Sequence, residues 1–255
     1  MRTITNSRKL AVVPAYNEAA CIGGVLRALQ ERAPEFEVLV VDDGSTDATS
    51  RIADRAGARV VKHPFNLGVG GAVQTGFTFA VERGYDYLVQ VDGDRQHDPG
   101  EIRRLEHAMA ESDVDMVCGS RFLHEDHKYP APVSRRTGIH LFAFLLSKVV
   151  GQRVSDPTSG FRLYNRRAIG VFARDYPHDY PEVEAVLMVH AHRLRMCEVP
   201  VRMYVRGGGV SSIKGTGKST YYMIKVLLAL LVGLARRRAS VEPGDEAAIT
   251  AAHGI

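Results

Sequence analysis

"LVQVDGDRQHD", Leu88 to Asp98, begins as an apolar strand and continues into two carboxylates that flank a glycine. "FEVLVVDDGST", Phe36 to Thr46, repeats the pattern, with Asp42 and Asp43 directly after an apolar run. Ligands of an open α/β sheet bind in the crevice beyond the carboxyl ends of its strands. The two stretches therefore predict a sheet that gathers four aspartates at one edge.

Strands and helices alternate around these two stretches. Strands are predicted at 10–14, 36–41, 58–63, 86–92 and 114–122, and segments with helical spacing of apolar residues lie between them. The strands read as continuous apolar runs, which is typical of strands buried on both faces. The pattern predicts an α/β fold with a mostly parallel central sheet covered by helices on both faces.

The order of elements changes beyond Phe122. Helices are predicted at 139–151, 182–194 and 220–238, and strands within 155–165 and 196–206. The helix at 220–238 is apolar with tyrosines at one end and an arginine cluster at the other, which favours an interfacial helix; an ordinary core helix is the alternative. The residues after it have the composition of a disordered tail.

Composition excludes several classes of protein. The cysteines are Cys21, Cys118 and Cys197, and no CxxC pair exists, so neither a disulfide framework nor a zinc knuckle is expected. A net charge of +4 without a basic stripe among aromatic residues argues against a nucleic-acid partner. The longest apolar run, 226–235, has half of the roughly 20 residues that span a bilayer. We expect a cytoplasmic protein with a surface contact to membrane.

The acidic edge of the sheet predicts a metal site. Clustered carboxylates repel one another unless cations balance them. Asp92, Asp94 and Gln96 offer the hard oxygen ligands that Mg²⁺ or Mn²⁺ prefers, whereas His97 is interpreted as a packing residue. A metal of this kind usually also holds substrate phosphates, so we expect a nucleoside diphosphate. For Asp47 and Asp98 we prefer a structural role as turn residue or helix cap.

Six blocks of the chain, in order, resemble family 2 glycosyltransferases, and more narrowly the polyprenyl-phosphate (dolichyl-phosphate) hexosyltransferase branch. They are "VVPAYNEA", "VVDDGSTD", "NLGVGGAVQTG", "VQVDGDRQHDP", "GSRF" and "SGFRLYN". The resemblance implies a GT-A fold at 8–215, with a nucleotide-sugar-binding half at 8–122 and an acceptor half at 123–215. A membrane-interface helix at 216–238 and a disordered tail at 239–255 would follow.

The resemblance also implies roles for individual residues. The nucleoside pocket would be lined by Pro14, Tyr16 and Glu18, and base and ribose would be contacted by Val41 and Asp43. The diphosphate would lie at Asp92, Gly93 and Asp94, with Asp92, Asp94 and Gln96 as metal ligands. The phosphates would meet Arg121 and Arg206, whose planar forks suit phosphate, and further contacts are expected from Arg162 and Lys214.

The expected reaction is metal-dependent, inverting transfer of a hexose from a GDP- or UDP-sugar to polyprenyl phosphate at the inner face of the plasma membrane. By analogy, a small integral membrane protein would present or flip the lipid. A lipid phosphate is already anionic at pH 7 and needs no general base. A glycan hydroxyl, the alternative acceptor, needs a carboxylate base, for which Asp156, Glu182 and Glu184 are candidates. The third possibility is a non-catalytic sugar-nucleotide sensor.

Two other enzyme classes are disfavoured. The chain has no tryptophan and so lacks the QxxRW block of processive family members. "GGGVSSIKGTGKST", Gly207 to Thr220, ends like a nucleotide-hydrolase P-loop, but Ser212 stands where that loop needs its first glycine. We interpret this stretch as a loop that closes over the donor diphosphate. Ser212 also stands where the dolichyl enzymes have a lysine, with Lys214 nearby, which leaves the donor nucleotide open.

Overall fold

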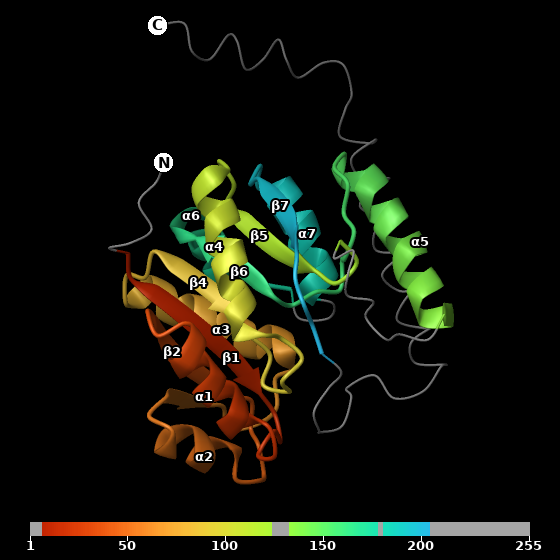
Figure 1. Ribbon diagram of the computed structural model, residues 1–255. Coiled ribbons are helices and arrows are strands. Elements are labelled where there is room, and N and C mark those ends of the chain that lie inside the picture. The colour runs from red at the N-terminus through yellow and green to blue at the C-terminus, as the bar shows by residue number, and fades with distance from the viewer. Residues whose placement is uncertain (1–6, 124–132, 178–180, 205–255) are drawn as a thin grey trace, which may run out of the picture. The chain divides into compact units, whose positions relative to one another are not determined.

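The computed structural model describes residues 7–123, 133–177 and 181–204 (Figure 1). These residues belong to one compact unit, Met1–Val210. Arg206 and Lys214 lie outside the described residues, as do the helix predicted at 216–238 and the tail predicted at 239–255.

A seven-stranded sheet forms the centre of this unit. Its order is β3 (Arg59–Lys62), β2 (Phe36–Asp42), β1 (Lys9–Ala15), β4 (Tyr87–Gln90), β6 (Arg162–Asn165), β5 (Met116–Ser120) and β7 (Met196–Pro200). Every pair is parallel except those of β6, which runs antiparallel to both β4 and β5. The prediction of a mostly parallel sheet is confirmed.

Helices cover both faces of the sheet, as Figure 1 shows. The helices of the described ranges are α1 (Ile22–Arg32), α2 (Thr49–Arg55), α3 (Val69–Glu82), the 3-10 turn η1 (Pro99–Glu101) with α4 (Ile102–Glu111), α5 (Val133–Val150), α6 (Arg166–Arg174) and α7 (Pro181–Ala191), of which α5 packs against α7. Ala11 and Val13 of β1 share a core cluster with apolar residues of α1 and α4. Val12 between them faces α3, because strand side chains alternate between faces.

Two elements differ from the sequence predictions. Helix α5 begins at Val133, six residues before its predicted start at 139, and α6 was not predicted. In α6, Asn165 caps the first turn by accepting a 3.0 Å hydrogen bond from the Ala168 amide, and Ile169 and Phe172 are buried. An asparagine followed by apolar residues at this spacing is a helix-start signal that identifies α6. Among the helices of the described ranges, none combines the length and apolar character needed to cross a bilayer.

Close packing of α3 on β1 and open space beside α6 predict opposite effects for a glycine-to-alanine substitution in each helix. A methyl group at Gly76 of α3 would lie 2.5 Å from Cγ1 of Val12. We expect Gly76→Ala to destabilise the protein by about 1–3 kcal/mol through overpacking. Gly170 of α6 has no other group within 4 Å of the same position, so Gly170→Ala should stabilise by up to about 1 kcal/mol. Urea unfolding of both variants checks this; equal effects would contradict the packing argument.

Candidate active site

Two acidic turns meet at the carboxyl end of β1. The Asp43 amide donates a 2.8 Å hydrogen bond to the carbonyl of Ala15, the last residue of β1. A methyl group at Gly93, between Asp92 and Asp94, would lie 3.5 Å from Cβ of the same Ala15. The turns that follow β2 and β4 therefore pack against one residue. This places the predicted donor-binding acids at one edge of the sheet.

A tight turn brings Gln96 back onto Asp94. Arg95 adopts a left-handed backbone, with φ of 69°, and the Asp94 side chain is buried. Asp94 Oδ1 accepts from the Gln96 amide at 3.0 Å, and Oδ2 accepts from Gln96 Nε2 at 2.5 Å. Asp92 is more accessible, with 32% of its side chain exposed. The turn thus juxtaposes two of the predicted metal ligands, with Asp92 next to them in the chain.

His97 braces Asp92. The Asp92 amide donates to His97 Nδ1 at 3.0 Å, so the proton of a neutral ring resides on Nε2, which lies 3.5 Å from Asp92 Oδ2. The ring is buried and stacks on Phe161 at a centroid distance of 4.9 Å. His97 therefore packs beneath the turn, as its sequence interpretation expected.

The oxygen donors of this turn suit a divalent cation that is shared with a substrate. Within the described residues, no group of three or more His, Cys, Asp or Glu side chains gathers to hold a metal. Mg²⁺ in nucleotide sites is typically bound by one or two carboxylates, and phosphate oxygens and water complete its shell. Asp94, the amide oxygen of Gln96 and Asp92 match that composition, so the residues present fit the predicted metal.

The paired aspartates after β2 have different surroundings. Asp42 is fully buried and accepts from the Ser45 amide at 2.8 Å and from the Ser50 hydroxyl, which gives it a structural role. Asp43 accepts from the amides of Leu67 and Gly68, at 2.9 and 2.8 Å, just before α3 begins. Of this pair, Asp43 remains the residue predicted to meet the nucleoside.

The other residues predicted for the nucleoside pocket lie at the same end of β1 and β2. Pro14 and Val41 are buried where these strands pair, and Tyr16 is 48% exposed just beyond β1. Glu18 is buried, and its carbonyl accepts the amides of Cys21 and Ile22 at the start of α1. Tyr16 is thus the accessible member of the set.

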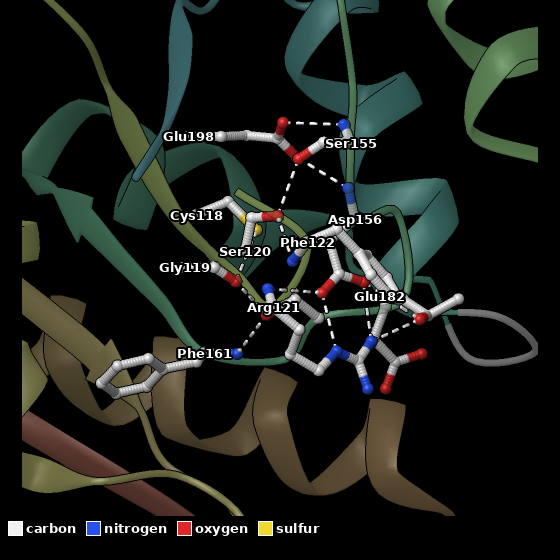
Figure 2. A network of polar contacts seen from close by, with 12 residues as sticks. Cys118, Gly119, Ser120, Arg121, Phe122, Ser155, Asp156, Phe161, Glu182 and Glu198 are labelled. Atoms are coloured by element: carbon white, nitrogen blue, oxygen red, sulfur yellow. Dashed lines mark hydrogen bonds and ion pairs between the residues drawn. The ribbon is translucent and has the colours of Figure 1, made fainter. Parts of the chain in front are cut away.

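Arg121 is held by a buried ion pair, shown in Figure 2. Its Nε and Nη2 donate to the two carboxylate oxygens of Asp156 at 2.7 and 2.6 Å, and Nη2 also donates to the Thr158 hydroxyl at 2.6 Å. Asp156 is fully buried and Arg121 is 8% exposed. Both carboxylate oxygens of Asp156 accept hydrogen bonds from Arg121, so Asp156 holds the guanidinium in place. This argues against Asp156 as a general base.

The segment that carries Asp156 is itself fixed by the edge strand. Glu198 of β7 accepts from the amides of Ser155 and Asp156 at 2.7 and 3.1 Å, and Ser155 shares a 2.7 Å hydroxyl contact with Ser120 of β5 (Figure 2). Sequence reasoning missed this role of Glu198. The sequence signal that could have identified this role is the acidic residue in the otherwise apolar strand "MCEVP".

Glu182 and Arg162 link α7 to the site. Burial raises the pKa of the Glu182 carboxyl and the charge of Asp92 raises it further, against the lowering effects of Arg162 and Arg121. In Figure 2, Glu182 lies beside Arg121. Arg162 is only 1% exposed and donates to the Glu182 carbonyl at 2.5 Å. The structure thus places Arg162 in the interior against α7, and its contact with a phosphate stays a prediction.

Comparison with known proteins shows which family this chain is similar to. The family model "Glycosyl transferase family 2" matches residues 10–172, more than half of the chain. Undecaprenyl-phosphate mannosyltransferase of Micrococcus luteus is 32% identical over 82% of this chain and 88% of its own length. UDP-N-acetylglucosamine–dolichyl-phosphate N-acetylglucosaminyltransferase of Methanococcus voltae is 29% identical over 75% of this chain and 83% of its own.

A solved structure supports the fold. Glucosyl-3-phosphoglycerate synthase from Mycobacterium tuberculosis, crystallised with Mn²⁺, uridine diphosphate and glucosyl-3-phosphoglycerate, has a TM-score of 0.64. The similarity covers 89% of this chain and 80% of that chain at 21% identity. The chain is therefore a glycosyltransferase with a GT-A-like fold, and it belongs to glycosyl transferase family 2.

Proposed function

We propose that this protein transfers a hexose from a nucleoside-diphosphate sugar to polyprenyl phosphate, with inversion at the anomeric carbon. The observation that carries the proposal is the meeting of the two acidic turns, at Asp43 and at Asp92 to Asp94, on Ala15 at the end of β1. One turn is suited to the nucleoside and the other to a metal-bound diphosphate. The two lipid-phosphate-dependent relatives support the acceptor class.

The leaving nucleoside diphosphate needs compensation of its developing negative charge. We propose that Mg²⁺ or Mn²⁺, held by Asp92, Asp94 and Gln96, supplies part of it; the Mn²⁺ and uridine diphosphate bound by the structural neighbour support this. Arg121 supplies a fixed positive charge, since Asp156 and Thr158 hold its guanidinium at three points. Arg206 is proposed as the second cation.

The acceptor proposal follows from the chemistry of its nucleophile. A polyprenyl phosphate oxygen is anionic at neutral pH, so the transfer needs no proton acceptor. Asp156, one base candidate, is occupied by Arg121. A glycan hydroxyl remains the alternative acceptor because Glu182, with its raised pKa, lies near Arg121 and Asp92. We place the reaction at the inner face of the plasma membrane, where a peripheral enzyme meets both the soluble donor and the lipid.

The test is an assay of purified full-length protein with Mn²⁺, undecaprenyl phosphate and a panel of GDP- and UDP-hexoses. We expect one donor to give a butanol-extractable sugar lipid, detected by mass spectrometry, and we expect chelation of Mn²⁺ to abolish it. Glycan acceptors run in parallel. Metal-dependent product on a glycan hydroxyl alone would assign the alternative acceptor, and no product on any acceptor would overturn the proposal.

A further inference from the structure

We propose that His63 is a positioning residue for donor binding: it orients the Asp43 carboxylate toward the nucleoside and ties it to α3. The inference rests on the proposed function, since it assumes that Asp43 meets the nucleoside of the donor. His63 itself would touch neither the sugar nor the diphosphate. Its place in the chain, directly after β3 at the same edge of the sheet, is the sequence signal that points to it.

The two ring nitrogens of His63 both have partners. Nδ1 lies 2.7 Å from Asp43 Oδ1, and Nε2 lies 2.9 Å from the hydroxyl of Thr75 in α3. Nδ1 faces a carboxylate oxygen, which can only accept, so Nδ1 carries a proton. The Thr75 hydroxyl also lies 3.0 Å from the Gly71 carbonyl, one turn earlier in α3. His63 thus bridges the acidic turn and the helix.

The backbone fixes the ring in place. The His63 amide donates to the Asp42 carbonyl at 2.8 Å, so the residue continues the pairing of β3 with β2. The His63 and Asp43 side chains are almost completely buried. A hydrogen bond between buried groups, one of them charged, is stronger than its equivalent in water. This contact therefore restricts rotation of the carboxylate.

Counting acceptor positions shows what the carboxylate can still bind. An ionised carboxylate accepts about four hydrogen bonds. Among the described residues, Oδ1 of Asp43 accepts from His63 and from the Leu67 amide, whereas Oδ2 accepts only from the Gly68 amide. One acceptor position on Oδ2 is left for an N–H of the base or a hydroxyl of the ribose. The His63 side chain occupies Oδ1, so Oδ2 is the oxygen that can bind the nucleoside.

Three substitutions separate positioning from mere packing. In His63→Asn the amide nitrogen takes the place of Nδ1 and keeps the bond to Asp43. His63→Gln places its amide nearer to Nε2 and loses that bond, and His63→Phe keeps ring volume without any donor. His107→Gln is the matched control, because His107 lies on α4 with 69% of its side chain exposed.

The measurement is calorimetric binding of UDP, GDP and inorganic pyrophosphate, each with Mn²⁺, to the full-length variants. For the nucleotide that the wild type binds more tightly, we expect affinity to fall roughly tenfold or more in His63→Gln and His63→Phe, as for loss of a hydrogen bond to a charged group. His63→Asn and His107→Gln should stay near the wild type, and pyrophosphate binding should not change. With the donor sugar, KM should rise and kcat should change little.

Other outcomes would overturn the inference. Equal losses in His63→Asn and His63→Gln would show that the Nδ1 bond is not what matters. If pyrophosphate affinity fell together with nucleotide affinity, or if thermal stability fell in proportion to affinity, the role of His63 would be structural only. Failure of the wild type to bind either nucleotide would instead remove the proposed function and this inference with it.

Discussion

Asp94→Asn lowers kcat for sugar transfer by about 10³-fold, which is the largest catalytic effect that we expect from a single substitution. The amide keeps the shape of the side chain and can still accept from the Gln96 amide, so the turn at Arg95 persists. What it loses is the negative charge that, in the proposed mechanism, would hold the divalent cation against the leaving diphosphate. The measurement is steady-state transfer at increasing Mn²⁺ concentration.

The control for Asp94→Asn is Asp113→Asn. Asp113 is 61% exposed and pairs with Arg195 on the surface, so its loss should leave both kcat and the Mn²⁺ dependence unchanged. Near-normal activity of Asp94→Asn, or activity of the wild type after complete removal of metal, would contradict the assignment of the metal site. Restoration of Asp94→Asn by high Mn²⁺ would support it, because a weakened site fills at higher metal concentration.

Asp156→Ala should have the largest effect on stability, a loss of about 3–5 kcal/mol in the free energy of unfolding. Asp156 is fully buried, and its removal leaves the charged Arg121 guanidinium in the interior without the carboxylate that balances it. The Arg121 amide also loses its 3.1 Å bond to Asp156 Oδ2. Urea unfolding followed by circular dichroism gives the value.

Two companion variants make the Asp156 result interpretable. Asp113→Ala breaks an exposed ion pair and should cost no more than about 1 kcal/mol. The double substitution Arg121→Met with Asp156→Leu removes both charges, and it should recover much of the stability lost in Asp156→Ala while transfer stays low. A loss below about 1 kcal/mol in Asp156→Ala would show that water reaches the pair and that the buried ion pair is not stabilising.

Much of the site could be predicted because its residues are close together in the chain. An apolar strand followed at once by carboxylates has one consequence in a parallel sheet: the acids lie at its carboxyl edge. The position of the acidic turn from Asp92 to Gln96 can therefore be predicted from eleven residues, Leu88 to Asp98. Local periodicity likewise predicted the strands and most of the helices, since burial on one or both faces leaves a repeating pattern.

The difference in role between Asp42 and Asp43 did not follow from the residue pattern, because the two are identical in type and adjacent in sequence, and only the family resemblance singled out Asp43. It depends on which carboxylate meets the amides before α3 and which meets Ser45 and Ser50. The pairing of Arg121 with Asp156, which lie 35 residues apart, likewise depends on contacts that form only in the folded chain. Neither pattern repeats along the chain, so no local signal records it.

The sequence by itself determined the α/β class, the family and the acidic edge, because each is written in short-range patterns of apolar and charged residues. Only the tertiary structure decided that β6 enters the sheet antiparallel between β4 and β5, and that Arg162 lies between Gln90 and Cys118. A strand of four buried residues looks the same in either direction. Its direction is set by which neighbours it pairs with, and that is a property of the folded chain alone.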